Sequence, residues 1–238
     1  MSIVITNSKV NYGPKVVTDG LINYWDAANS KSYPGSGTIW YDLVGGNDGT
    51  LINEAIGTTT PGYMTFDSAN YDYVSLSSTH TFNITSSSFS IWFQSYGDYT
   101  DTDHHYQTRG MLLGNNAPSS SNLVLRDNGS NYLIEGESNT NEDRYCMTNY
   151  DYNKYQWINL HINFINSVGA TYINGEWLEN NVIVDGLTVF RLGGNLSGTL
   201  SYRELLDGKI PILMYYNKHL STNEILQNFN TIKSRFGL

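Results

Sequence analysis

The sequence predicts an all-β domain, a two-sheet antiparallel β-sandwich with one short C-terminal α-helix. Composition is the first observation: the 238 residues include 22 Gly and 19 Tyr with many Ser, Thr and Asn, a mixture of strand-forming and turn-forming residues. The second observation is a series of short apolar runs separated by turn residues. The third is length, because sandwiches of this size often form one domain and bury enough surface to need no disulfides.

The predicted strands begin at Gly20. In chain order the first eight runs are LINYW, TIWYDL, GYMTF, YDYVSL, SFSIWFQ, RGMLLG, NLVLR and NYLIEG. Turn residues separate each pair, and no linker or repeat divides the chain, so we expect one domain over residues 20–238. Residues 1–19, in which Pro14 limits any helix, form an extended arm. The arm either closes the sandwich as an edge strand or serves in attachment.

The clearest strand signal lies at residues 157–174. In WINLHINFI, which begins at Trp157, apolar and polar residues alternate, and this predicts a strand with one apolar and one polar face. The pair Asn174-Gly175 then separates two further runs, and it predicts a β-hairpin because both residues tolerate the positive φ angles of a type I′ turn. The later run KIPILMYYN is apolar at nearly every position. It predicts a strand buried on both faces, with Pro211 at a bulge or an edge.

A single α-helix is expected near the C-terminal end. Ser221 and Glu224 have the spacing of a capping box, in which the hydroxyl and the carboxylate each bond a free backbone amide. Three apolar residues recur at helical spacing: Ile225, Phe229 and Ile232. Lys233 and Arg235 suit the negative end of the helix dipole, and Gly237 can end the helix.

Charge and apolar patterning exclude several classes of function. Asp and Glu outnumber Lys and Arg by 22 to 13, a formal net charge of −9, whereas a general nucleic-acid binder needs clustered basic residues. The same charge disfavours attachment to anionic lipid. No run approaches 18 apolar residues, so we expect no membrane insertion, and no signal-peptide pattern is visible. Cys146 is the single cysteine, which excludes an intramolecular disulfide and a cysteine zinc site.

Several segments together resemble one known family. They are FSIWFQ, WINLHINF followed by ATYINGEWL, FRLGG, and DGKIPILMYYNKHLSTNEILQNF. From about residue 20 to its end, the chain is similar to LamG-like domains of the concanavalin A-like lectin/glucanase superfamily, whose ending has the pattern G-x-I…Y-N-x-x-L-S-x-x-E-I. The resemblance implies a jelly roll for residues 20–238.

The beginning and the end of the chain show a narrower resemblance. VTDGLINYWDAANSKSYPGSGTIWYDLVGGNDGTL and NFNTIKSRFGL are similar to jelly-roll virion structural proteins of tailed bacteriophages. Such proteins are head decorations, tail-fibre modules and baseplate components. The resemblance therefore implies a protein made in the host cytoplasm and displayed on the virion surface, with capsid or tail proteins, and further copies of itself, as partners.

We expect no enzymatic activity. Glycoside hydrolases need two carboxylates about 5–10 Å apart across a groove, and laminarinase-like members of the superfamily place them as E-x-D-x-x-E, a string that this sequence lacks. Glu135 and Glu137 are the nearest pair on a strand, but we place them at a hairpin end. His161 alternates with asparagines and is interpreted as a hydrogen-bonded sheet residue. The motifs G-x-S-x-G, H-E-x-x-H and the P-loop are also absent.

The segment YGDYTDTDHHY, residues 96–106, is the first candidate for ligand binding. Its candidate metal ligands are Asp98, Asp101 and Asp103, which favour calcium, while His104 and His105 beside them favour a transition metal. The spacing fits neither an EF-hand nor a zinc signature, so we expect no obligatory cofactor. The alternatives are an exposed polar loop and a contact surface for sugar or protein.

Tyrosines are the second candidate feature. Exposed tyrosines offer a large contact area at low entropic cost and stack on sugar rings. The candidate ligand-binding tyrosines are Tyr96, Tyr99 and Tyr106 of the first segment, and Tyr145, Tyr150 and Tyr152 of a polar loop, CMTNYDYNKYQW, that also contains Tyr155. Packing at the rim of the sandwich is the alternative.

Two compatible functions follow. The first is a non-enzymatic virion structural protein, a head decoration, tail-fibre or baseplate component, that mediates assembly and attachment to the host surface. The second is a carbohydrate-binding module that recognises host-surface glycans through the two tyrosine-rich segments, with calcium as an assisting ion.

Overall fold

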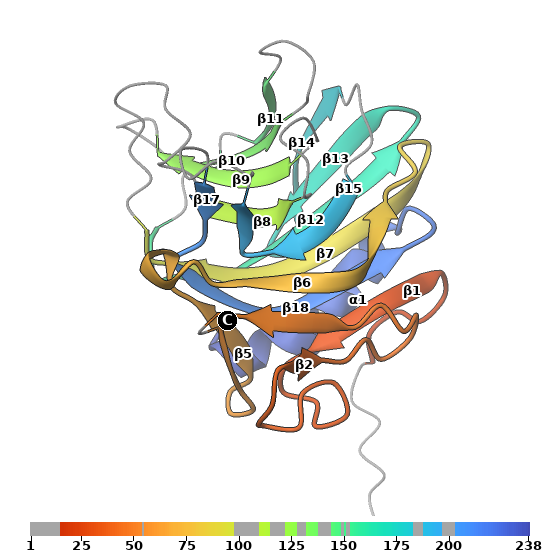
Figure 1. Ribbon diagram of the computed structural model, residues 1–238. Coiled ribbons are helices and arrows are strands. Elements are labelled where there is room, and N and C mark those ends of the chain that lie inside the picture. The colour runs from red at the N-terminus through yellow and green to blue at the C-terminus, as the bar shows by residue number, and fades with distance from the viewer. Residues whose placement is uncertain are drawn as a thin grey trace, which may run out of the picture.

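The computed structural model describes residues 15–53, 55–97, 110–114, 122–127, 132–137, 144–148, 150, 153–182, 188–196 and 203–238. These residues form two eight-stranded antiparallel sheets packed face to face, with one α-helix on an outer side (Figure 1). The predicted all-β sandwich with one short C-terminal helix is therefore confirmed.

Sheet A has the strand order β14-β13-β12-β7-β18-β5-β4, and β1 also pairs with β18. Its strands are β1 (Leu21–Asp26), β4 (Ile56–Thr58), β5 (Tyr63–Phe66), β7 (Ser86–Ser95), β12 (Ile158–Ile165), β13 (Val168–Ile173), β14 (Glu176–Val182) and β18 (Gly208–Tyr216).

Sheet B has the order β11-β10-β9-β8-β15-β6-β3-β2. Its strands are β2 (Ile39–Trp40), β3 (Gly49–Ile52), β6 (Tyr73–Thr81), β8 (Gly110–Gly114), β9 (Asn122–Asp127), β10 (Tyr132–Glu137), β11 (Arg144–Thr148) and β15 (Thr188–Leu192). The remaining elements are the hairpin of β16 (Gly194–Leu196) and β17 (Arg203–Leu205), the helix α1 (Thr222–Ile232), and the short 3-10 helices η1 (Ser68–Asn70) and η2 (Lys233–Phe236).

The core between the sheets is centred on aromatic rings. Phe82, directly after β6 of sheet B, packs against Phe164 of β12 and Tyr215 of β18, with ring centroids 5.6 and 4.7 Å apart. Trp25 of β1 meets Tyr215 edge-on at 5.6 Å. All four rings are buried, so this cluster joins sheet B to the central strands of sheet A.

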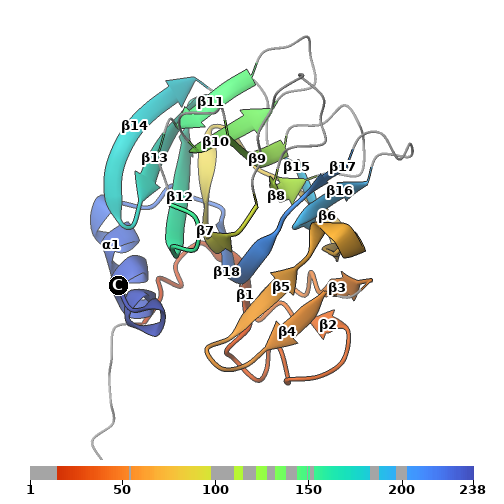
Figure 2. The same cartoon turned by 90° about the vertical axis from the view of Figure 1, so that its left-hand side faces the viewer.

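The polar face of β12 is buried rather than exposed to water. Helix α1 covers the side of sheet A that faces away from sheet B (Figure 2), and Trp92 of β7 stacks on Phe229 of α1 at 5.6 Å. Beneath this cover the Asn163 side chain donates to the carbonyl of Leu220 and accepts from its amide, at 2.7 and 2.9 Å. His161 is hydrogen bonded to the same side chain at 3.0 Å, which confirms its interpretation as a sheet residue.

The predicted hairpin at Asn174-Gly175 is confirmed. It joins β13 to β14, and φ is 53° at Asn174 and 81° at Gly175, as a type I′ turn requires. A Cβ at Gly175 would lie 3.1 Å from both Leu226 and Phe229 of α1. The glycine is therefore needed twice, for its backbone conformation and for the close approach of the helix.

Strand β18 is buried on both faces and has a bulge at its proline, as predicted. Its first residues pair with β5 and its later ones, from Ile212, with β1, while β7 lies along its other edge. The register with β7 shifts between Lys209 and Ile212. Pro211 has no amide hydrogen, but its carbonyl still accepts from Ala27, so the irregularity leaves the strand anchored.

Helix α1 begins with the predicted capping box. The Ser221 hydroxyl accepts from the Glu224 amide, and the Glu224 carboxylate accepts from the Ser221 amide at 2.8 Å. The basic residues Lys233 and Arg235 lie in η2, which ends at Gly237 with φ of 76°, rather than in the last turn of α1. No helix among the described residues is long and apolar enough to cross a membrane.

The described part of the expected N-terminal arm packs against the C-terminal helix. Val17 is buried, its amide donates to the Asn228 side chain at 2.7 Å, and its carbonyl accepts from the Tyr216 hydroxyl at 3.1 Å. Residues 15–19 form no strand. Residues 1–14 lie outside the described ranges, so the choice between edge strand and attachment arm stays open.

We predict that the buried His161 makes the protein lose stability in mild acid. Burial lowers the pKa of His161 to about 4, although its bond with Asn163 partly opposes this shift. The unfolded chain takes up the proton near its usual pKa of 6.5, so the free energy of unfolding should fall between pH 6.5 and 4, by up to about 3 kcal/mol. Urea unfolding at a series of pH values measures this slope, to which His80 adds because burial also lowers its pKa.

The variant His161→Gln, whose amide can still donate to Asn163, should flatten that slope by about one proton, or 1.4 kcal/mol per pH unit. His219→Gln, the same substitution at an exposed histidine, is the matched control. An unaltered slope in His161→Gln would contradict the prediction.

Candidate functional site

One end of sheet A presents a group of aromatic and polar side chains on its outer face, which we call the tyrosine platform. Its members are Tyr63, Gln94, Tyr96, Tyr155, Trp157 and Lys209. They come from the first residue of β5, the end of β7, the segment before β12 and the start of β18. The platform is thus assembled from four segments that are far apart in the sequence.

Strand register brings these residues together. Lys209 pairs with Gln94 on one side and with Thr65 on the other, and the pairing of Ile158 with Phe93 places Trp157 beside Gln94. The residues that alternate with them in sequence, such as Phe93 and Ile158, are buried in the core. Because side chains alternate along a strand, the platform residues lie on the opposite, outer face.

The most exposed member of the platform is Tyr155. Its side chain stacks on Tyr96 with ring centroids 5.3 Å apart and 24° between the planes, and 65% of the residue surface is exposed. Its amide donates to the carbonyl of Ser95 at 2.9 Å, and its carbonyl accepts from the Gln94 side chain. The Tyr96 hydroxyl in turn donates to Oε1 of the Gln94 side chain at 2.9 Å. Tyr155 is therefore an exposed ring on a fixed backbone.

The C-terminal 3-10 helix supports the platform from the side. Phe236 of η2 contacts Trp157 at 4.5 Å and Trp92 at 4.9 Å, and Trp157 contacts Tyr63 at 6.0 Å. The guanidinium of Arg235 donates to the Asp26 carboxylate at 2.7 Å, and to the carbonyl of the residue before Tyr63 at 2.9 Å. These bonds fix η2 against β1 and against the segment that leads into β5.

A cation lies among the rings of the platform. The Nζ atom of Lys209 is 4.1 Å from the ring centroid of Tyr63 and 5.4 Å from that of Tyr96. Partial burial acts to lower the pKa of Lys209, but the adjacent Tyr96 and Tyr63 hydroxyls raise it above its usual value overall. The amine is therefore protonated at neutral pH.

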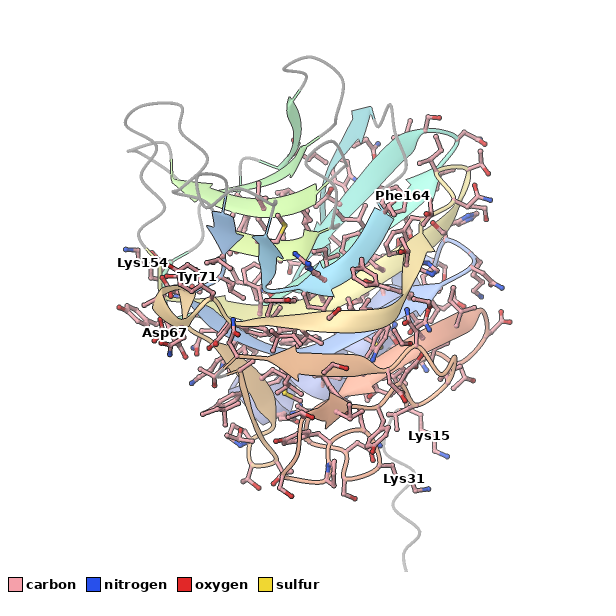
Figure 3. All side chains as sticks on the ribbon, viewed as in Figure 1. Lys15, Lys31, Asp67, Tyr71, Lys154 and Phe164 are labelled. Atoms are coloured by element: carbon pink, nitrogen blue, oxygen red, sulfur yellow. The ribbon has the colours of Figure 1, made fainter. Side chains whose placement is uncertain are left out.

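Helix η1 borders the same end of the sandwich. The Asp207 carboxylate accepts from the Ser68 amide at 2.7 Å and from its hydroxyl at 2.9 Å, while the Asp207 carbonyl accepts from the Tyr96 amide at 2.8 Å. The bonds of Asp207 therefore connect the platform to η1. Tyr71 and Asp67, which flank η1, project from the same side of the molecule as Lys154, whereas Phe164 lies toward the other side (Figure 3).

The structure places three of the predicted ligand-binding tyrosines. Tyr96 belongs to the platform, whereas Tyr150 is half-buried and packs against the core. Tyr145 lies in β11 rather than in a loop, because it pairs with Gly136 of β10. Tyr99, Tyr106 and Tyr152 lie outside the described residues.

The predicted metal ligands Asp98, Asp101 and Asp103 also lie outside the described residues, so the calcium site stays a prediction. Within the described residues, no group of three or more His, Cys, Asp and Glu side chains is arranged to hold a metal ion.

The placement of Glu135 and Glu137 differs from expectation. Both belong to β10, which pairs with β9 and β11 over these residues, so the pair lies within sheet B and not in a turn. Gly136 between them pairs with Leu123 of β9 and Tyr145 of β11, so the strand continues through the glycine without a turn.

Comparison with known proteins identifies relatives of this fold. The family model Laminin_G_3, described as concanavalin A-like lectin/glucanases superfamily, matches residues 67–226. No curated protein matches the chain by sequence.

Three solved structures illustrate the shared fold. A Trypanosoma rangeli sialidase matches 100% of this chain and 37% of its own, with 13% identity and a TM-score of 0.64. Domain 4 of AbnA, an extracellular arabinanase from Geobacillus stearothermophilus, was solved with arabinotriose and matches 87% of this chain and 97% of its own, with 15% identity and a TM-score of 0.60. The binding domain of botulinum neurotoxin DC was solved with rat synaptotagmin II. It matches 91% of this chain and 52% of its own chain, with 14% identity and a TM-score of 0.60.

These comparisons correct one expectation from the sequence. Enzymatic activity was excluded, yet the structural neighbours include a sialidase and an arabinanase, so this exclusion is contradicted. The chain spans about a third of the sialidase chains that it matches. At these identities the likeness shows the fold alone, and it assigns no reaction to this chain.

We predict that Phe236→Ala weakens the support of the platform. Removing this half-buried ring from Trp92 and Trp157 should lower the free energy of unfolding by about 1–2 kcal/mol. Urea unfolding followed by tryptophan fluorescence measures the change, and the native spectrum should shift to longer wavelength. Leu238→Ala at an exposed position two residues later is the control. Identical unfolding midpoints for the two variants would show that Phe236 gives no support.

Proposed function

We propose that this chain, which belongs to the concanavalin A-like lectin/glucanases superfamily, binds carbohydrate through the tyrosine platform. The observation that supports this most strongly is the exposure and stacking of Tyr155. Its exposed ring stacks on Tyr96, and its backbone amide and carbonyl are both hydrogen bonded. A sugar ring has an apolar face of C–H groups, which packs against the face of an aromatic ring. A ring whose backbone is already fixed loses little entropy when a sugar stacks on it.

The platform also provides polar groups beside the ring. Sugar hydroxyls need hydrogen-bond partners to replace the water that they lose on stacking. The hydroxyl of Tyr63, the ammonium of Lys209 and the indole of Trp157 lie within the same group of contacts. Domain 4 of the arabinanase, which resembles this chain over 97% of its own length, was solved in complex with arabinotriose, and this supports the same class of ligand here.

We predict that Tyr155→Asn weakens glycan binding about tenfold, equivalent to about 1.4 kcal/mol. Asparagine is chosen because φ at Tyr155 is 65°, a conformation that Asn tolerates, so the variant removes the ring without adding backbone strain. Affinity is measured by calorimetry with the glycan that binds best in a panel of bacterial-envelope polysaccharides.

The matched control is Tyr41→Asn. Tyr41 is also exposed but lies directly after β2, where its amide donates to the carbonyl of Ser32. Binding that is weakened equally in both variants, or in neither, would refute the platform as the binding site.

We further propose that the domain is displayed on the surface of a virion. The two segments whose sequences resemble phage structural proteins, residues 17–51 and 228–238, pack together: Val17 bonds to Asn228, and Arg235 bonds to Asp26. The two segments therefore lie side by side, and we propose that the part of this region away from the platform contacts a capsid or tail protein. Host-surface glycans are then the ligands that such a domain would meet.

This proposal predicts that the chain stays with particles at a fixed stoichiometry through density-gradient purification. Quantitative mass spectrometry of purified particles measures its copy number against the major capsid protein. Absence of the chain from particles that contain all their other structural proteins would refute display, while leaving carbohydrate binding to be judged by the Tyr155 variant.

A further inference from the structure

The lysine of the platform differs from Lys218 and Arg235, two cations that the structure fixes by ion pairs. Lys218 bonds to the carboxylates of Asp19 and Glu224, and Arg235 bonds to that of Asp26. Within the described ranges no carboxylate forms an ion pair with Lys209, whose charge is held instead by the rings of Tyr63 and Tyr96. The two tyrosine rings thus hold the Lys209 ammonium in place without neutralising its positive charge.

Two polar groups of the platform, the Gln94 side chain and the Tyr96 hydroxyl, already bond to other platform residues. The Gln94 amide donates to the Tyr155 carbonyl, and its oxygen accepts from the Tyr96 hydroxyl. Gln94 therefore links Tyr155 to Tyr96, and Lys209, its cross-strand neighbour, is the charged member of the platform.

Overall charge makes this position unusual. The chain has a formal net charge of −9, which repels anionic polymers at long range. At physiological salt the screening length is about 8 Å, so an acidic ligand that reaches the platform responds mainly to the charges in direct contact. A cation held over aromatic rings is such a charge, and it keeps its proton at neutral pH.

Resting on the proposed function, we infer that the tyrosine platform selects saccharides that carry a carboxylate, with a sugar ring on Tyr155 and the carboxylate at Lys209. Both residues contact Tyr96, so one short oligosaccharide can reach both. Uronic acids and sialic acids share this chemistry, and the experiment distinguishes them.

The test compares matched ligands that differ in the carboxylate. Polygalacturonate is compared with its methyl ester, and 3′-sialyllactose with the methyl ester of its sialic acid carboxylate, by calorimetry on the full chain at about 0.15 M salt, where long-range repulsion is screened. We expect the acidic member of at least one pair to bind fivefold or more tightly than the neutral member. Preference within the first pair alone identifies uronic acids, and preference within the second alone identifies sialic acids.

Three variants then assign the preference to Lys209. Lys209→Met, which keeps the apolar stem, should abolish the preference, so that the acidic and the neutral member of a pair bind with equal affinity. Lys209→Arg keeps the charge and should retain the preference. Lys31→Met, at an exposed position after β1, is the control and should resemble the wild type. Thermal unfolding of each variant confirms that it is folded before binding is measured.

Equal affinity for both members of both pairs, or a preference that survives in Lys209→Met, would overturn the inference. Carbohydrate binding that Tyr155→Asn still weakens would then leave the proposed function intact with a neutral ligand. If the wild type binds no member of either pair, the inference fails, and the polysaccharide panel alone decides whether the platform binds sugar.

Discussion

Strand β18 makes the hydrogen bonds on which the remainder of the structure depends. It pairs with β7 along one edge and with both β5 and β1 along the other, and the change of partner occurs at Pro211. Proline cannot donate to a ladder, so a strand that contains it must either lie at an edge or interrupt its pairing. Here the interruption lets two short strands share one side of β18, which joins the beginning of the domain to its end.

Because side chains alternate between the two faces of β18, its residues contact the core, the C-terminal helix and the platform. Tyr215 faces the core beside Phe82, and Tyr216 faces the C-terminal helix, where its hydroxyl bonds to Asn228 and Val17. Lys209, before the bulge, faces the outer surface among the platform rings. The core, the helix and the platform are therefore coupled through one rigid element, which is how sheets hold binding groups more accurately than loops do.

Local sequence patterns predicted the elements but not their surroundings. The Asn174-Gly175 turn, the Ser221 cap and the apolar run around Pro211 are short-range signals, and the structure confirms each of them. Burial of the polar face of β12 could not be predicted, because it depends on where α1 packs, some 60 residues later in the chain.

The platform was predicted only in part, for the same reason. Tyrosine-rich loops indicated Tyr96 and the segment of Tyr155, but no pattern in the sequence singles out Tyr63, Trp157 or Lys209. These three become neighbours through cross-strand register and ring contacts, and register is set by the whole sheet. Once the strand pairing is known, residues that lie on one face at the ends of paired strands can be identified, and these three residues are then found.

The left-handed backbone at Tyr155 has a consequence for variation at this position. A bulky residue in that conformation costs about 1–2 kcal/mol relative to glycine or asparagine. In a library randomised at this codon, selection for foldedness alone should enrich Gly and Asn, whereas selection for ligand capture should retain aromatic residues. Stability and recognition thus impose opposite preferences on one position, and the two enrichment profiles separate them without any knowledge of the ligand.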